Sequence, residues 1–134
     1  MKFTIYRGSW VRGGSKNIFK FGESALLNNY NRQCCLGQIC SQVGIPSEDL
    51  KELGWPSSTP VRFHDTLRSI GLMTPKEIFD GDNDTGAVNM CVDYNDTFSI
   101  SDKVREGYIK EQLEPLGHKI VFKNGVAPWL QESV

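Results

Sequence analysis

The sequence predicts a single α+β domain over residues 1–134, in which a small, mostly antiparallel sheet is packed by several short helices and one longer C-terminal helix. Short runs that alternate apolar and polar residues indicate half-buried strands. Runs with apolar residues three and four positions apart, bounded by capping residues and glycine, indicate helices. A length of 134 residues, 39% of them hydrophobic and 23% charged, is typical of one globular domain.

Three segments have the pattern of strands. Residues 2–7 (KFTIYR) alternate Phe3 and Ile5 with more polar neighbours. Residues 87–93 alternate valine and methionine with polar residues, and residues 118–123 (HKIVFK) form the last predicted strand. We expect these three strands to make up the sheet.

The first clear helical pattern lies in the segment RQCCLGQICSQVG, where the apolar residues Cys35, Leu36, Ile39, Cys40 and Val43 fall on one helical face. Gly44 ends this helix, because glycine is the usual residue after a helix C-terminus. Before it, residues 24–35 form two apolar pieces around a polar NNYN, which is typical of a hairpin.

Further helices follow along the chain. PSEDLKELG begins with Pro46 and two acidic residues and ends at Gly54, and short helices are expected within residues 62–71 and 74–81. The longest helical pattern spans residues 101–117, with Ser101 as its N-cap and Gly117 at its end. The segment DGDNDTG between the last two helices is expected to be an acidic loop.

The three cysteines at positions 34, 35 and 40 raise the question of a metal site or a nucleophile. Zinc would need His64 or His118 from distant segments, and adjacent cysteines do not easily bind one ion tetrahedrally. A reactive thiol would need a partner that the sequence does not show. We therefore expect the cysteines to pack in the core, with Gly37 allowing a neighbouring backbone to approach the helix closely.

Charge is distributed unevenly along the chain. Residues 1–40 carry six basic side chains and one acid, a net charge of +5, whereas the other 94 residues carry nine bases and fifteen acids. Arginine, glycine and tryptophan near the N-terminus are suited to phosphate binding and base stacking. The sequence thus predicts an anion site formed by Arg7, Trp10, Arg12, Lys16 and Lys20. The alternative is a solvated loop whose charge offsets the acidic remainder.

Other motifs are less specific. The spacing of Asp80, Asp82 and Asp84 resembles the start of a calcium loop, but Cys91 stands where the last glutamate is needed. Asp93 and Asp96 could pair as acid and base or hold magnesium, and aspartate is equally ordinary at a strand end and before a helix. Accordingly, no metal, cofactor or catalytic residue is predicted.

The stretch SALLNNYNRQCCLGQICSQVGI, together with IGLMTPKEIF, an NDT segment and LEPLGHKIVF, resembles small uncharacterised proteins of tailed phages that carry a CCLG motif. Cys34, Cys35, Leu36 and Gly37 match that motif, and Asn95 and Asp96 resemble the ND pair before the last helix of those proteins. The resemblance implies expression in the cytoplasm of an infected bacterium and no assigned chemistry.

These observations predict a non-catalytic, phage-encoded protein that antagonises host defence by sequestering a small phosphorylated or nucleotide-type ligand. An inhibitor that contacts a host protein, acting for instance as an acidic nucleic-acid mimic, is the alternative. A small hydrolase using acidic residues is the third reading. Nucleic acid would prefer a wider basic face, which an isoelectric point of about 6.1 argues against. No segment is long and apolar enough for a membrane span, and a homo-oligomer is left open.

Overall fold

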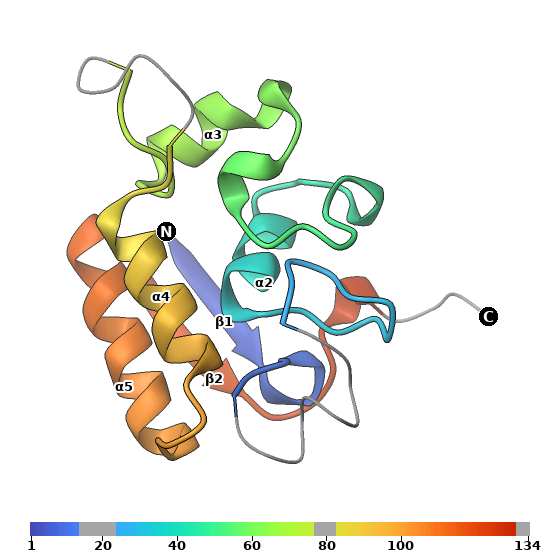
Figure 1. Cartoon of the computed structure of the whole chain (residues 1–134), viewed down its shortest axis with the longest axis vertical. Helices are drawn as coiled ribbons and strands as arrows, with labels where there is room; N and C mark the ends of the chain where they lie inside the picture. The colour runs from blue at the N-terminus through green and yellow to red at the C-terminus, as the bar shows by residue number, and fades with distance from the viewer. Residues whose placement is uncertain (14–23, 77–82, 131–134) are drawn as a thin grey trace.

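The computed structural model describes residues 1–13, 24–76 and 83–130, which form an α+β fold (Figure 1). Two strands, β1 (Lys2–Tyr6) and β2 (Lys119–Lys123), make up the sheet. The α helices among the described residues are α2 (Cys35–Gln42), α3 (His64–Ser69), α4 (Gly86–Asp96) and α5 (Asp102–Leu113). Short 3₁₀ turns connect them, at Arg7–Ser9, Ser47–Asp49, Pro56–Ser58, Val61–Phe63, Glu114–Leu116 and Pro128–Leu130.

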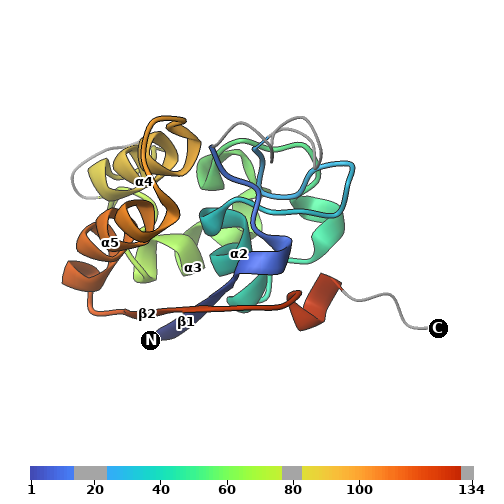
Figure 2. The ribbon, with the colours of Figure 1, turned by 90° about the horizontal axis from the view of Figure 1, so that it is seen from below.

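The two strands run parallel, with Lys2 beside Lys119 and Tyr6 beside Lys123, so the predicted antiparallel arrangement is wrong. Alternation of apolar residues indicates a strand but says nothing of its direction. Here one strand opens the chain and the other follows α5, and the intervening helices lie on one side of the sheet (Figure 2).

The third predicted strand is also wrong, because residues 87–93 lie within helix α4. Val88, Cys91 and Asn95 are buried and stand three and four positions apart, which is helical spacing. Thr85 caps the helix by accepting a hydrogen bond from the Val88 N–H. Residues 87–93 fit the two-residue period of a strand as well as the spacing of a helix. The Thr85 cap and packing against α5 favour the helix.

The free edge of β1 is closed by helix α2 in place of a third strand. The amide of Gln42 accepts a hydrogen bond from the Thr4 N–H at 3.0 Å and donates one to the Thr4 carbonyl at 2.8 Å. Gln38, one helical turn earlier, does the same with Tyr6, at 2.7 Å and 3.1 Å. Two side-chain amides thus satisfy the backbone groups of the sheet edge.

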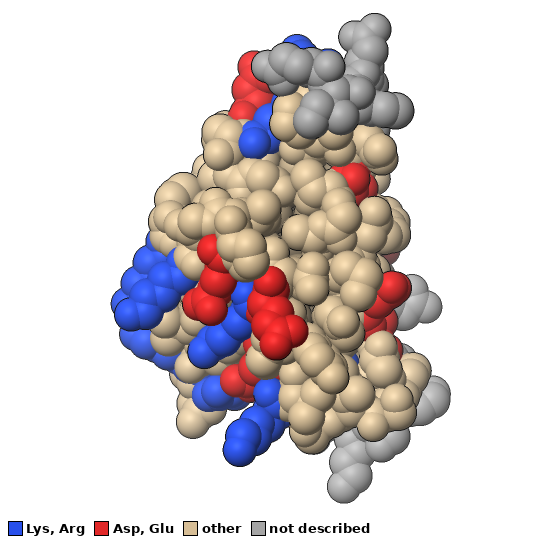
Figure 3. Space-filling model, turned by 90° about the vertical axis from the view of Figure 1, so that its left-hand side faces the viewer, with Lys and Arg blue, Asp and Glu red and all other residues tan. Residues whose placement is uncertain are grey.

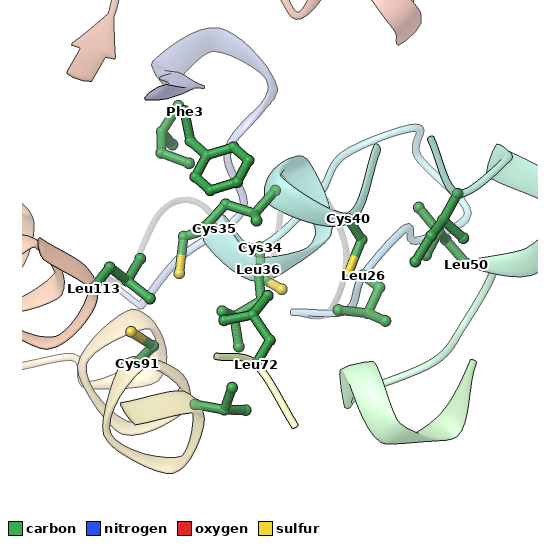
Figure 4. Close-up of a cluster of buried hydrophobic side chains, with 14 of the residues drawn as sticks. Phe3, Leu26, Cys34, Cys35, Leu36, Cys40, Leu50, Leu72, Cys91 and Leu113 are labelled. Carbon is green, nitrogen blue, oxygen red and sulfur yellow. The ribbon is translucent and has the colours of Figure 1, made fainter. Parts of the chain in front are cut away.

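The core centres on α2, as the helical spacing of its apolar residues predicts. Cys35, Leu36, Ile39 and Cys40 are each at most 1% exposed and pack with Phe3, Leu72 and other apolar side chains (Figure 4). Gly37 is required at this position, since a Cβ built on it would lie 2.0 Å from the Leu26 carbonyl oxygen. The expected close backbone approach is confirmed.

The remaining helical predictions have mixed outcomes. Ser101 caps α5 as expected, and β2 follows it as predicted, but α5 has 12 residues against 11 in α4, so it is not a distinctly longer helix. The segment after Pro46 forms only a 3₁₀ turn. The expected helix at 74–81 lies largely outside the described residues. In the described part, no helix has the length and apolar character needed to cross a membrane.

Candidate functional site

The predicted anion site is the first candidate, and the structure places Arg7 in an ion pair. Its Nε and Nη2 donate to the two carboxylate oxygens of Glu106 on α5, at 2.9 Å and 2.7 Å, and its Nη1 donates to Asn124 at 3.1 Å. The hydrogen bonds to Glu106 raise the pKa of Arg7 above its ordinary value. All three guanidinium nitrogens of Arg7 therefore already donate hydrogen bonds within the protein.

Arg12 is paired in the same manner with Asp102, the first residue of α5 and one helical turn before Glu106. Its Nε and Nη2 donate to the two oxygens of Asp102, at 2.9 Å and 2.8 Å, and Nη1 donates to the Trp10 carbonyl at 2.8 Å. The guanidinium also lies 4.4 Å from the centre of the Trp10 ring. Arg7 and Arg12 thus join the N-terminal segment to α5.

Trp10 is 3% exposed, and its indole N–H donates to Asn95 Oδ1 at 2.7 Å. Its ring also packs against Phe122, with centroids 5.2 Å apart. Lys16 and Lys20 lie outside the described residues. Phosphate and base binding by this segment remains a prediction, and binding through its described part would require the ion pairs to open and Trp10 to leave the core.

The cysteines form the second candidate, and all four are buried and free. Burial raises the pKa of Cys34 and of Cys91 to about 12, and raises those of Cys35 and Cys40 as well. Thiols with such pKa values are protonated and poor nucleophiles at neutral pH. Nowhere in the described ranges do three or more His, Cys, Asp or Glu side chains gather in a metal-binding group.

The other titratable residues singled out in the sequence make structural contacts. His64 is 2% exposed, and its Nε2 lies 2.8 Å from the Thr59 carbonyl oxygen. Asp84 accepts hydrogen bonds from the N–H and hydroxyl of Ser57, at 3.1 Å and 2.7 Å. Asp80 and Asp82 lie outside the described residues, while Asp93 and Asp96 are exposed.

The CCLG segment (residues 34–37) and the Asn95–Asp96 pair meet in the structure through Asn95. Its Oδ1 accepts hydrogen bonds from the Cys35 N–H at 3.1 Å and from Trp10, and its Nδ2 donates to the Val11 carbonyl at 3.1 Å. The same Nδ2 lies 3.0 Å from Ser24 Oγ and 3.0 Å from Asp96 Oδ1. Asn95 therefore joins the start of α2, the N-terminal segment and the end of α4.

Arg105 holds the chain around Asn95 in place. The side chain is 1% exposed, and its guanidinium donates to backbone carbonyls on both sides of the α4–α5 turn and to Gly13. Its Nε makes no hydrogen bond to the described residues and lies 3.6 Å from Asp102 Oδ1, within ion-pair distance. The carbonyl acceptors and Asp102 together offset the cost of burying the charge and tie Arg105 to the α4–α5 turn.

A groove opens beside Asn95. Its first hollow has a volume of about 190 Å³ and is lined by Cys34, Trp55, Asn95 and Asp96 among others. Its second hollow, of about 300 Å³, is lined by Asn28, Asn29, Tyr30 and Glu52. Ser24, Ala25 and Gly54 line both hollows, so the two adjoin.

The groove combines aromatic rings with negative charge. Trp55 is 38% exposed and Tyr30 62%, so both rings are accessible to a ligand in the groove. Asp96 and Glu52 supply two carboxylates, and the described lining contains no lysine or arginine. Such a surface is complementary to cationic and hydrogen-bonding groups, and it disfavours phosphate.

Reasoning from the sequence missed Trp55, Tyr30 and Glu52 as site residues. Trp55 stands before Pro56 and Tyr30 lies in the polar run NNYN, so both are aromatic residues at turns, where burial is least expected. The presence of aromatic residues at two turns was therefore a signal that the sequence did contain. The proximity of the two turns did not follow from the sequence, because it depends on backbone bonds such as Glu52 N–H to the Leu27 carbonyl at 2.7 Å.

Comparison with protein-family models, curated proteins and solved structures finds no match to this chain. The fold and the groove are therefore the grounds for any functional statement.

Proposed function

We propose that this protein is a non-catalytic binding protein that acts by direct contact with a partner protein, which it engages through the groove between Trp55, Asp96, Tyr30 and Glu52. The observation that carries this proposal is the pairing of exposed aromatic rings with carboxylates in one concave surface. Aromatic residues in partly desolvated hollows are frequent anchors of protein interfaces.

The charges favour a cationic polypeptide over a phosphorylated ligand. A phosphate in the groove would face Asp96 and Glu52, with no lysine or arginine in the described lining to offset the repulsion. The arginines expected to bind phosphate are instead paired with Glu106 and Asp102. A basic segment of a partner protein would be attracted by Asp96 and Glu52 and would not need the paired arginines.

The biological setting of the proposal rests on the resemblance to phage proteins. In that setting the chain acts in the cytoplasm of an infected bacterium, and its partner is a host protein of the defence response. The meeting of the CCLG and ND motifs at one edge of the groove is consistent with this, because the residues shared with those proteins would then support the binding surface.

Site-specific photocrosslinking tests the proposal. A benzoylphenylalanine at Tyr30 keeps an aromatic ring in the groove, and the same probe at Val61, which is 74% exposed on a 3₁₀ turn, is the matched control. We expect a discrete adduct with a bacterial protein from position 30 only, and its loss when Trp55→Ala and Asp96→Asn are added. Equal labelling from both positions would contradict a specific interface.

A nucleotide-type ligand is the second candidate, and one observation favours it. Gly13 and Ser24, which flank the segment containing Lys16 and Lys20, both contact Asn95 at the groove, through the Gly13 N–H to the Asn95 carbonyl and through Ser24 Oγ. The two described residues that flank the predicted cations thus lie beside the first hollow, where the exposed Trp55 ring is available to stack on a base.

A melting-temperature panel of mono-, di- and cyclic nucleotides tests this second candidate. A nucleotide at 100 times its Kd should add about 2.7 kcal/mol to stability, and Lys16→Ala with Lys20→Ala should remove that gain. An unchanged melting curve across the panel excludes it.

The remaining alternatives receive less support. The face over α4 and α5 mixes acidic and basic side chains, which does not favour an acidic nucleic-acid mimic there (Figure 3). Catalysis by acidic residues would require carboxylates in a partly desolvated site, and Asp93 and Asp96 are both exposed.

A further inference from the structure

The two hollows of the groove repeat the same pair of groups. The first hollow has one exposed aromatic ring and one carboxylate, Trp55 and Asp96. The second has Tyr30 and Glu52. Since Ser24, Ala25 and Gly54 line both, the two pairs lie next to each other along one surface.

Each carboxylate is held by an asparagine amide through one oxygen only. Asn95 Nδ2 donates to Asp96 Oδ1 at 3.0 Å, and Asn29 Nδ2 donates to Glu52 Oε1 at 2.9 Å. Among the described residues, no hydrogen-bond donor contacts Asp96 Oδ2 or Glu52 Oε2. Each carboxylate is thus oriented by the protein while keeping one oxygen for a ligand.

The backbone under both carboxylates is also fixed. Asn95 is 1% exposed and is hydrogen bonded on both sides of its amide. Glu52 adopts a left-handed conformation, with φ of 62°, and its N–H donates to the Leu27 carbonyl. A non-glycine residue in this conformation is uncommon and is held by its surroundings. Little reorganisation of the groove would therefore be needed on binding.

The group that best fits a hollow lined by both an aromatic ring and a carboxylate is a guanidinium. It is planar, it stacks on aromatic faces, and it donates several hydrogen bonds to carboxylate oxygens. An ammonium group lacks the planar surface. We propose that the groove binds two arginine side chains of one extended segment of the partner protein, one at Trp55 and Asp96 and the other at Tyr30 and Glu52. This inference rests on the proposed function, whose site it makes specific.

Blocked synthetic peptides test it with the intact protein. The peptides carry two arginines, one to four residues apart, in a glycine and serine background, and matched peptides carry citrulline, which has the same shape without the charge. We expect binding for at least one spacing, and a loss of about tenfold for each arginine replaced, which corresponds to one charge-assisted contact. Equal binding of the citrulline peptides overturns the proposal.

Variants assign each arginine to a subsite. Asp96→Asn and Glu52→Gln should each weaken the peptide about tenfold, and each should abolish the effect of citrulline at one position while leaving the other intact. Lys51→Met, next to Glu52 but outside the described lining, is the control and should not weaken binding. If neither carboxylate variant changes the affinity, the two-arginine site is wrong.

The outcome is separable from that of the proposed function. A host protein crosslinked at Tyr30 without any arginine-peptide binding would overturn only the two-arginine site. Arginine-peptide binding without any host adduct would support the site and contradict the proposed partner.

Discussion

The amide of Asn95 joins three segments that are distant in the sequence, and this single side chain sets one wall of the groove. It caps the first turn of α2 through Cys35, binds the Trp10 indole and orients Asp96. Its buried hydrogen bonds are satisfied, so losing either end of the amide would leave donors or acceptors unpaired. In the pair Asn95–Asp96, the buried Asn95 is therefore structural, whereas Asp96 faces the solvent.

Gly37 gives the sharpest prediction at the residue scale. We expect Gly37→Ala to destabilise the protein by about 1–3 kcal/mol, because the new Cβ would overlap the Leu26 carbonyl. Gly107→Ala, in the interior of α5 with open space around it, is the control and should stabilise by about 0.5–1 kcal/mol. Urea denaturation measures both. A Gly37→Ala protein as stable as the original would contradict the close approach.

The cysteines are predicted to be inert in the folded protein. At pH 8 a thiol reagent should modify none of the four until denaturant is added, since burial keeps the thiols protonated. Cys40→Ser should cost about 1–3 kcal/mol, because the hydroxyl would have no partner in the core. Rapid modification of one thiol in the native state would reopen the question of a reactive cysteine.

At the scale of elements, the closure of the β1 edge by Gln38 and Gln42 explains how a two-stranded sheet is stable here. Two strands alone are marginal, and the helix supplies both packing and hydrogen bonds. The sequence QICSQ places the two amides one turn apart, but their role is not visible without the fold. The parallel direction of the two strands is likewise not visible in the sequence.

Gln38→Glu tests that closure. Its carboxylate would face the Tyr6 carbonyl without a hydrogen to donate, so we expect a loss of about 1–3 kcal/mol at pH 7. The loss should shrink toward pH 5, where a buried, protonated carboxyl donates again. Gln112→Glu, half-buried on α5, is the control and should change little at either pH. Chemical denaturation of both variants at pH 7 and pH 5 measures the change in the free energy of unfolding.

The ion pair between Arg12 and α5 predicts a dependence on acid. The hydrogen bonds from Arg12 lower the pKa of Asp102 in the folded state. Its contribution is therefore complete above the unfolded pKa, about 3.9, and is lost as the pH falls through the lower folded value. Because Asp102 is half exposed, we expect less than about 1 kcal/mol. Asp102→Asn should remove that part of the acid dependence, measured from urea midpoints between pH 6 and 2.5.

At the scale of the whole molecule, the sequence predicted the α+β class, the core helix α2 and the role of Gly37 from local spacing and capping. It did not predict α4, because Val88, Met90 and Val92 fit a strand while Val88, Cys91 and Asn95 fit a helix. The charge pattern near the N-terminus suggested a ligand site. The acids that pair with Arg7 and Arg12, Glu106 and Asp102, lie 99 and 90 residues away, so only the fold reveals them.

The same reasoning explains why the groove was not predicted. Trp55 and Tyr30 occupy separate turns, and Asp96 ends a helix that was expected to be a strand. None of these three residues, taken alone in the sequence, indicates a binding site. Their combination arises from the bonds between residues 25–28, 32–34 and 51–53, including Leu26 N–H to the Leu53 carbonyl at 2.7 Å.

The central claim is that ligands meet this protein at Trp55 rather than at Trp10, and the indole signals of its three tryptophans test it directly. The indoles of Trp10 and Trp129 donate to Asn95 and Gln33, whereas Trp55 lies in the groove. In a nitrogen-15 NMR titration with the two-arginine peptide, the account predicts a shift of the Trp55 indole signal while the other two stay in place. A nucleotide that moves the Trp10 signal and leaves Trp55 unchanged would contradict it and return the binding site to the N-terminal segment.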